Sequence, residues 1–379
     1  MHGLILVEPA RGTSPGGSVL LYDAGRESYT KGWNQSIHRL DKGAAGAAER
    51  RRFAVARPVL TALLVIVGIP AVQVGYVVLA EHLLRFVPEK HQGKLRPWLW
   101  LAPALFFLGV FLVYPAASTF YLSVLGPDSR EFVGVQNYRF AFTEREMLIA
   151  FRNNVFWLVV FTGITVSLGL AMAVLTDRVR YEPVARAVMF LPMAISFVAA
   201  GVIWKFVYEF RPLGLPQIGS LNALLLSVVP SFQPVAWLVN SSVNNAALIL
   251  VAVWVWVGFC LVILSAALKG IPVEVLEAAR VDGATEWRIF WRIILPMLAP
   301  TITVVATTMV IYALKAFDIV YVMTNGNFDT EVIANRMYKE MFNFRDFGRA
   351  SAMAVILFLA TIPVMAANIR RFRQQELTR

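Results

Sequence analysis

Apolar residues are grouped along the chain in long blocks, and short charged segments separate one block from the next. A helix that crosses a bilayer needs ~20 largely apolar residues, and seven blocks reach or approach that length. Strands of a membrane β-barrel would alternate apolar and polar residues over ~10 positions, and the block 246–268 does not alternate. The pattern predicts an all-α integral membrane protein, a polytopic helical bundle with helices over 58–80, 97–122, 153–176, 186–208, 246–268, 297–320 and 350–369.

The longest uncharged stretch, residues 212–268, is long enough for two membrane crossings. Its first part contains four prolines and several asparagines, and only 13 residues separate Pro216 from Pro230. A segment of that length is too short to span a bilayer as a helix. We therefore expect a single span at 246–268, preceded by an interfacial or re-entrant segment that stays on one face of the membrane.

Composition agrees with a membrane protein and excludes several other classes. Of the 379 residues, 58% are hydrophobic and 16% are charged, whereas a soluble domain is usually ~45–50% apolar and ~25% charged. The only cysteine, Cys260, cannot form an internal disulfide or a cysteine metal cluster. The net charge of +11 comes largely from Lys and Arg between apolar blocks, so we expect lipid contact and no nucleic acid partner.

Lys and Arg residues are unequally distributed between the two sets of loops, and cytoplasmic loops are the ones enriched in them. Fourteen lie after the first, third, fifth and seventh predicted helices, and nine lie in the opposite loops. The richer set is expected to be cytoplasmic. This places the C-terminus and the segment 269–296 inside, in a multi-pass membrane protein.

Residues 1–56 differ from the rest of the chain, because they contain eight glycines and only short apolar runs. We expect a disordered or loosely ordered tail with no cleavable signal peptide. Residues 57–96 would form an extra N-terminal transmembrane helix and a linker. If 58–80 crosses the membrane once, the tail lies outside, although the run 50–52 of three arginines favours the inside. A bent, non-spanning first segment would resolve this conflict.

The most informative polar segment is residues 269–296, KGIPVEVLEAARVDGATEWRIFWRIILP. Residues 273–281 favour a helix, Gly283 permits a sharp turn, and Thr285 could cap a second short helix through its hydroxyl. Trp287, Phe290, Trp291 and Ile294 recur at helical spacing and would form an amphipathic face at the membrane surface. The residues alone fit two interpretations, a simple connection between two spans and a surface that another protein approaches.

A resemblance favours the second interpretation. Glu-Ala-Ala at 277–279, Gly283, and Ile-x-Leu-Pro at 293–296 match the "EAA" signature of importer permeases of the ATP-binding-cassette superfamily in every spacing. The resemblance implies that the loop at 270–296 is a coupling element that docks on a separate ATPase. The residues that it implicates are Glu277, Ala278, Ala279, Asp282 and Gly283.

Residues ~97–379 resemble sugar permeases of the MalF type, and most of all α-glucoside transport permeases. The resemblance rests on the segments 190–197, 315–326 and 335–341. It implies a six-helix permease core over 97–370 in the bacterial cytoplasmic (inner) membrane and a cytoplasmic tail over 371–379. It also implies a second homologous permease, an ATPase dimer and an extracytoplasmic sugar-binding protein as partners. α-Glucosides are the expected substrates, and another sugar or a glycerol phosphate remains an alternative.

Candidate sugar contacts are expected near the middle of the membrane, where a sugar needs hydrogen-bonding groups and flat apolar surfaces. Lys315 and Asp318 are predicted on one face of the sixth helix, with Tyr312 and Tyr321 one turn to either side. A pair of opposite charges would reduce the ~2.5–3.5 kcal/mol cost of a charge in the membrane. The alternative is an ion pair near the outer interface that only fixes the helix.

Trp254 and Gly258 are further candidates in the fifth predicted helix. By resemblance they fall where a maltose permease lines its sugar pocket, although Trp254 replaces a polar residue there. Tryptophans of the interfacial belts lie at helix ends, and Trp254 lies well inside the span. It could stack on a sugar ring or pack between helices, and Gly258 could equally serve a close helix contact.

Motifs for catalysis are missing from the sequence. There is no G-x-x-x-x-G-K-[ST] phosphate loop, no H-E-x-x-H and no G-x-S-x-G. The four histidines lie in the tail or before the core and have no ligand spacing. We expect a transport subunit that is not an enzyme and has no cofactor, catalytic residue or metal. An ATP-independent secondary transporter is the less favoured alternative, since it would carry proton-relay residues in several spans.

Overall fold

The computed structural model describes residues 61, 65–177, 179–212 and 214–377, with side chains described as far as residue 370. The tail predicted over 1–56 lies outside the described residues. Helices account for nearly all of the regular structure, and the described residues contain no β-sheet, only an isolated bridge between Leu125 and Phe132. The chain divides into two compact units, residues 1–107 and 108–379, which are described separately.

The described part of the first unit is a helical hairpin. A helix over Val65–Leu84 is followed by a tight turn and by α2 (Glu89–Leu108). The two helices are joined by polar contacts of Glu81, which pairs with Arg96 at 3.0 Å and accepts a hydrogen bond from Trp100 Nε1 at 3.1 Å. The Tyr76 hydroxyl also donates to the carbonyl of Leu99. A helix is thus present where the extra apolar helix was predicted at 58–80; it continues to Leu84, beyond the predicted end, and residues 58–60 and 62–64 lie outside the described residues.

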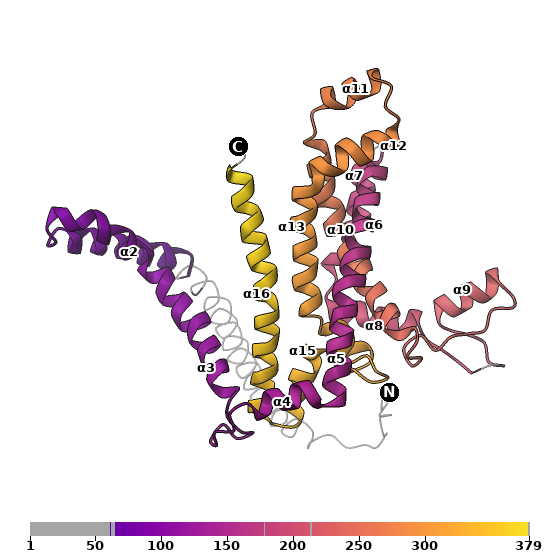
Figure 1. Cartoon of the computed structure of the whole chain (residues 1–379), viewed down its shortest axis with the longest axis horizontal. Helices are drawn as coiled ribbons and strands as arrows, with labels where there is room; N and C mark the ends of the chain where they lie inside the picture. Colours follow the sequence, from indigo (N-terminus) through magenta and orange to yellow (C-terminus); the bar gives the residue numbers. More distant parts are fainter. Residues whose placement is uncertain (1–60, 62–64, 178, 213, 378–379) are drawn as a thin grey trace, which may run out of the picture. The chain divides into compact units, whose positions relative to one another are not determined.

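The second unit is a bundle of helices with several short interruptions (Figure 1). Its α-helices are α3 (Tyr114–Leu122), α4 (Gln136–Thr143), α5 (Arg145–Phe156), α6 (Thr162–Thr176), α7 (Glu182–Phe190), α8 (Phe197–Val207), α9 (Ser220–Val228), α10 (Asn244–Lys269), α11 (Val273–Val281), α12 (Glu286–Ile289), α13 (Leu295–Leu314), α14 (Asp318–Met323), α15 (Ile333–Tyr338) and α16 (Phe347–Leu377). The intervening helical segments are η1 (Gly109–Val113), η2 (Trp157–Phe161), η3 (Leu191–Ala194), η4 (Phe290–Ile294) and η5 (Lys339–Asn343).

Six helices of the described residues are long and apolar enough to cross a membrane, and a bent pair would make a seventh crossing. The six are Val65–Leu84, Glu89–Leu122, Arg145–Thr176, Asn244–Lys269, Glu286–Leu314 and Phe347–Arg370. They correspond to six of the seven predicted spans, so the prediction of an all-α polytopic bundle is confirmed. Between Arg211 and Val243 the described residues contain only the nine-residue helix α9, which confirms a single span in the long uncharged stretch.

The fourth predicted helix, 186–208, is wrong as one continuous helix. The chain instead forms Glu182–Ala194 and Phe197–Val207, which meet at an angle of 100°. Pro192 lies in the short segment η3, and Ser196 has an extended backbone. The Ser196 hydroxyl accepts a hydrogen bond from the backbone N–H of Ala199 at 3.2 Å. Ser196 is thus the N-cap of α8, and the preceding helical segment ends at Ala194.

Helix α10 occupies the centre of the bundle, between α6, α7 and α13 (Figure 1). Helix packing in membranes depends on close approach at small residues, and α10 shows this where it crosses α6. A Cβ on Gly169 of α6 would lie 2.4 Å from the Cβ of Cys260. Glycine at 169 therefore permits this helix contact.

This contact generates a prediction with an internal control in the same helix. Gly169→Ala should destabilise the protein by roughly 1–3 kcal/mol, because the new methyl group forces α6 away from α10. Gly163→Ala should cause no loss, since no atom lies within 4 Å of its added Cβ and alanine favours helix. Thermal unfolding of the purified protein in detergent measures both. Equal melting temperatures for the two variants would contradict the packing role of Gly169.

Candidate functional site

The loop between α10 and α13 folds as the sequence predicts. Pro272 precedes α11, whose bounds Val273–Val281 coincide with the predicted helix. Gly283 has φ +76° and donates its N–H to the carbonyl of Arg280 at 3.0 Å. The Thr285 hydroxyl accepts a hydrogen bond from the N–H of Arg288 and caps α12. The result is a short helix, a turn that requires a left-handed residue, and a second helix.

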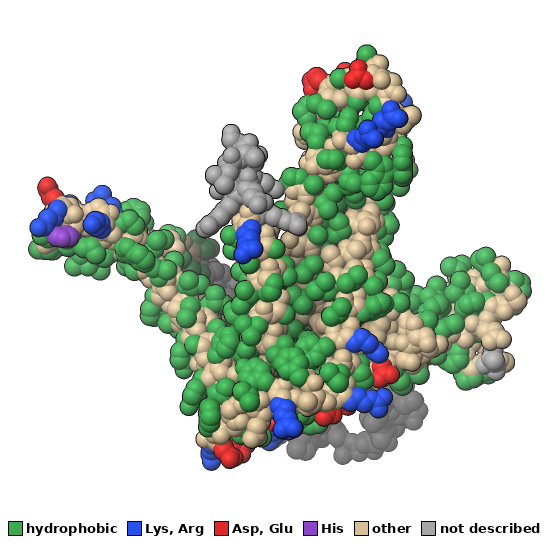
Figure 2. Space-filling view, in the orientation of Figure 1, with side chains coloured by type: hydrophobic (Ala, Val, Ile, Leu, Met, Phe, Trp, Pro, Cys, Tyr) green, Lys and Arg blue, Asp and Glu red, His purple; other side chains and the backbone are tan. Residues whose placement is uncertain are grey.

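Helix α11 extends beyond the end of the bundle (Figure 1), and none of its residues is buried. Glu277, Ala278 and Asp282 are exposed, and Ala279 is half-buried. Leu276 alone in this helix packs against the apolar group formed by Leu268, Ile271 and Leu298. The predicted coupling residues thus lie on an accessible surface with charged side chains at its tip (Figure 2).

An ion pair fixes α11 relative to α12. The guanidinium of Arg280 lies 2.8 Å from the carboxylate of Glu286, and this hydrogen bond raises the pKa of Arg280 above its usual value. The amphipathic face predicted on the second helix is also present. Trp287, Phe290 and Ile294 line a hollow of about 390 Å³ against α6, and Trp287 keeps a large exposed surface.

Within the bundle, four rings from four different segments meet in what we term the inner aromatic cluster. Its members are Phe161 of η2, Phe197 of α8, Trp256 of α10 and Tyr312 of α13. Tyr312 is central, with ring centroids 4.9 Å from Trp256, 5.3 Å from Phe161 and 5.6 Å from Phe197. Of the residues predicted to contact a sugar, Tyr312 alone belongs to this cluster.

The structure gives packing partners to the two candidates in α10. Trp254 contacts Trp204 edge to face at 5.7 Å. Gly258 lies against the backbone of α7, where an added Cβ would be 2.3 Å from the carbonyl oxygen of Met189. These contacts explain why α10 carries glycine at 258, and a role in sugar binding remains a prediction for both residues.

The expected pairing of Lys315 with Asp318 on one helical face is wrong. Helix α13 ends at Leu314 rather than near 320, and Lys315 forms its C-cap. The backbone then turns through Phe317, with φ −142° and ψ −62°, before α14 begins at Asp318. No ion pair joins the two side chains among the described residues. A turn between α13 and α14 therefore replaces the continuous helix.

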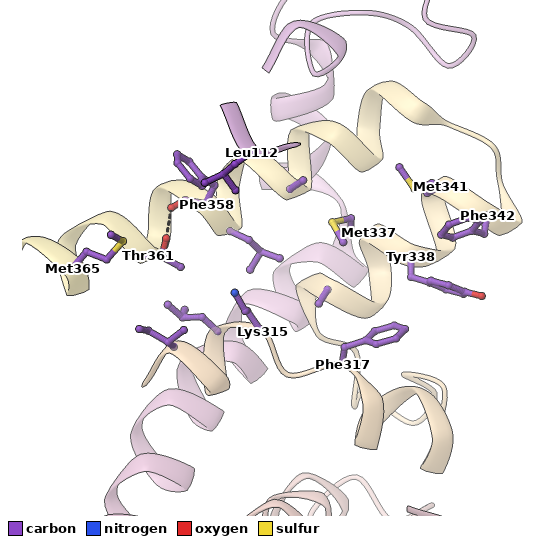
Figure 3. A pocket seen from close by; sticks show the side chains of 15 residues that line it. Leu112, Lys315, Phe317, Met337, Tyr338, Met341, Phe342, Phe358, Thr361 and Met365 are labelled. Carbon is purple, nitrogen blue, oxygen red and sulfur yellow. Dashed lines mark hydrogen bonds between the residues drawn. The ribbon is translucent and has the colours of Figure 1, made fainter. Parts of the chain in front are cut away.

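Lys315 instead faces a groove of about 690 Å³ between α13, α15 and α16 (Figure 3). Four rings along this region contact one another in series and form what we term the outer aromatic ladder. The ladder comprises Phe317, Tyr321, Tyr338 and Phe342, with successive centroid distances of 5.2, 5.0 and 4.8 Å. Tyr321, a predicted site residue, therefore lies with three rings that sequence reasoning did not select.

Asparagine side chains form a hydrogen-bond network at the end of the bundle opposite α11, and sequence reasoning did not identify this network. Asn153 donates from Nδ2 to the carbonyls of Asp329 and Glu331 at 2.7 and 2.8 Å. Asn154 accepts from the N–H of Ile333 at 2.9 Å, and Asn244 donates to the carbonyl of Phe328 at 2.7 Å. Buried amides thus fix the segment that precedes α15.

The same end contains a buried ion pair. Arg336 bonds to Glu340 at 2.8 Å and also pairs with Glu146. The side chain of Glu340 is 1% exposed, whereas that of Glu146 is 55% exposed. Burial raises the pKa of the Glu340 carboxyl, and the positive charge of Arg336 opposes that rise.

Removal of Arg336 should therefore have a pH-dependent cost. At about pH 8, Arg336→Ala should destabilise the protein by roughly 3–5 kcal/mol, because it leaves a buried carboxylate without its partner. The loss should be smaller at about pH 5, since a carboxyl with a raised pKa takes up a proton as the pH falls. Glu146→Ala removes only the exposed partner and should cost about 1 kcal/mol or less. Melting temperatures across pH test this, and a pH-independent loss would contradict it.

The described residues form a polytopic helical bundle with an exposed helix–turn–helix between two spans, an architecture typical of membrane transport permeases. Residues 163–370 match the family described as the inner membrane component of binding-protein-dependent transport systems. The chain belongs to this family.

Two curated relatives support the assignment. The chain is 60% identical over 281 residues to the osmoprotective compounds uptake permease protein GgtC of Synechocystis sp., covering 74% of this chain and 100% of the relative. It is 45% identical over 279 residues to the alpha-glucoside transport system permease protein AglF of Rhizobium meliloti, covering 73% and 82%. A chain of a bacterial ABC transporter that imports the acidic polysaccharide alginate has a similar fold, with TM-score 0.65, 20% identity and coverage of 76% and 99%.

Proposed function

We propose that this chain is the membrane-spanning permease of an ATP-driven importer of sugars or closely similar small polar solutes. The observation that carries the proposal is the exposed α11–α12 loop. It presents Glu277, Ala278 and Asp282 on an accessible surface beyond the bundle. The positive φ of Gly283 fixes the turn between the two helices. A surface of this kind suits docking of a separate protein on the membrane-inserted subunit.

The proposed assembly contains a second homologous permease, an ATPase dimer and an extracytoplasmic sugar-binding protein. The family description names dependence on a binding protein, and this chain has no phosphate loop of its own. The Lys and Arg excess favours the cytoplasmic side for the α11–α12 loop and the C-terminus. Residues 97–370 would form the transport core in the bacterial inner membrane, with 57–96 as an extra N-terminal transmembrane helix and linker and 371–379 as a cytoplasmic tail.

Aromatic rings would line this chain's half of the translocation path. Pyranose rings present flat C–H faces, which pack on aromatic side chains, while hydroxyl groups seek hydrogen bonds. The inner aromatic cluster and the outer aromatic ladder offer such faces, with Lys315 beside the ladder in the groove (Figure 3). Trp254, Gly258 and Asp318 would then act through the position of neighbouring helices, whereas Tyr312, Lys315 and Tyr321 would approach the sugar.

α-Glucosides are the substrates that we propose first, by analogy with the 45% identical relative. The 60% identical relative is named for osmoprotective compounds, and this makes such compounds the second candidate. Purification of the complex with its binding protein, followed by identification of the bound solute by mass spectrometry, separates the two. Neither substrate requires chemistry by this chain, so its proposed role is transport alone.

Reconstitution tests the function directly. The chain, its companion permease, the ATPase and the binding protein would be placed in liposomes, and uptake of a labelled α-glucoside measured with and without ATP. We expect uptake only with ATP and with binding protein present. Uptake by this chain alone, unaffected by ATP, would instead identify a secondary transporter.

The turn in the coupling loop gives a sharper prediction. Gly283→Pro should reduce ATP-driven uptake by roughly tenfold while ATP hydrolysis persists, because proline requires φ near −65° and cannot donate to Arg280. Gly214→Pro is the matched control. Gly214 also has positive φ, and no atom lies within 4 Å of an added Cβ at either glycine. Normal uptake by the Gly283 variant, or equal losses in both variants, would contradict a coupling role.

The inner aromatic cluster gives a prediction about substrate. Trp256→Ala should raise the KM for sugar uptake about tenfold, which corresponds to ~1.4 kcal/mol of lost contact, and should alter the order in which competing sugars inhibit. Trp237→Ala removes a tryptophan that contacts Tyr208 outside the cluster and should leave that order unchanged. Competition assays at matched protein levels provide the measurement. An unchanged profile in the Trp256 variant would leave the cluster with a packing role.

A further inference from the structure

Helix α7 is attached to the end of α10 by an ion cluster that the sequence analysis did not identify. The carboxylate of Glu182 lies 2.8 Å from Nζ of Lys269 and also pairs with Arg186. Arg186 in turn donates to the hydroxyl of Ser265. The Glu182 side chain is 15% exposed. Its carboxylate pairs with two cations at the edge of the bundle. We term these four residues the α7–α10 ion cluster.

The cluster lies directly beside the coupling loop. Lys269 is the last residue of α10, Gly270 is its C-cap, and α11 follows after Pro272. Ile271 is buried and packs with Leu268, so the chain between Lys269 and α11 is anchored. The chain between α11 and Lys269 is therefore short and packed, and the ammonium of Lys269 in turn contacts the carboxylate of Glu182.

A second contact joins α7 to α10 at the other end of α7. The Cα of Gly258 lies against the backbone of Met189 and Phe190, with no room for a side chain. Helix α7 is thus held to α10 by charge near Glu182 and by close backbone contact near Phe190. Two contacts so far apart on one nine-residue helix fix both its position and its direction.

The segment that follows α7 leads to the inner aromatic cluster. After the bend at η3, α8 begins at Phe197. The ring of Phe197 stacks on Trp256 at 6.2 Å and contacts Tyr312 at 5.6 Å. A continuous series of contacts therefore runs from α11 through Lys269, Glu182 and α7 to a ring of the proposed sugar path.

We propose that Glu182 is a positioning residue for coupling, which makes α7 follow the end of α10 when α11 moves and so shifts Phe197 in the proposed path. This inference rests on the proposed coupling role of α11. Glu182 contacts neither sugar nor ATPase in this account. Its carboxylate transmits displacement through Lys269, and the conformational change at the aromatic cluster depends on that attachment.

The test uses the complete transporter in liposomes and measures sugar uptake and ATP hydrolysis in the same sample. Glu182→Gln keeps the side-chain volume and removes the charge. We expect sugar transported per ATP to fall roughly fivefold or more, with hydrolysis continuing and the melting temperature changing little. The exchange variant E182K/K269E again pairs a carboxylate with a cation across α7 and α10. Its ratio of sugar transported to ATP hydrolysed should be well above that of E182K alone or K269E alone.

Glu81→Gln provides the matched control. It removes the carboxylate of the Glu81–Arg96 ion pair, which has a similar distance of 3.0 Å but belongs to the other compact unit. The ratio of sugar to ATP should equal that of the unmodified protein. This comparison separates a coupling role from a general effect of losing an ion pair.

The outcomes distinguish this proposal from the proposed function. If the unmodified complex shows ATP-driven uptake and Glu182→Gln leaves the ratio of sugar to ATP unchanged, the positioning role is overturned and the transport function stands. If Glu182→Gln lowers uptake and hydrolysis in parallel and the exchange variant gives no recovery, the residue is structural only. If the unmodified complex shows no ATP-dependent uptake, the transport function is overturned, and the positioning role with it.

Discussion

The burial of α10 is the constraint on which the remaining structure depends. In the most apolar 18-residue segment of α10, 67% of the residues are buried, whereas at most 28% are buried in the corresponding segments of the other described spans. Lipid removes the hydrophobic driving force between helices, so contacts within the bilayer rely on close packing. Small residues at the crossings provide it. Gly169 lies against Cys260, and Gly258 lies against the backbone of α7. Glycine at these two positions therefore permits α6 and α7 to pack closely against α10.

The features that sequence reasoning predicted well are those that local rules determine. Hydrophobic length located six of the spans, because every backbone group in a bilayer must be bonded within its own helix. The loop before α13 was equally predictable. Val273–Val281 formed the expected helix, Gly283 adopted positive φ, and Thr285 capped α12. Each of these outcomes depends on residues close together in the sequence.

The features that sequence reasoning missed depend on distant contacts. Helix α13 ends at Leu314 without a glycine or proline to signal it, and the turn that follows places Lys315 in a groove built from α15 and α16. The inner aromatic cluster draws single rings from four segments, so no spacing within one segment announces it. The Asn153 bonds to Asp329 and Glu331 join positions more than 170 residues apart. The bend in the fourth predicted span is different, because Pro192 lies next to it and proline interrupts a helix.

The end of the bundle opposite α11 is held by buried amide hydrogen bonds in addition to the buried Arg336–Glu340 ion pair, whereas the end beside α11 is held by the α7–α10 ion cluster. Opposite α11, buried amides of Asn153, Asn154 and Asn244 bond to backbone groups. Such bonds weaken steeply when distance or angle changes, and they specify one geometry. Beside α11, Glu182 attracts Lys269 and Arg186 near the surface. Charge attraction falls gradually with distance and tolerates changes of angle. If α11 docks a separate ATPase as proposed, the directional amide bonds would hold the α15 end in one geometry, and the contacts of Glu182 would let α7 adjust when α11 is displaced.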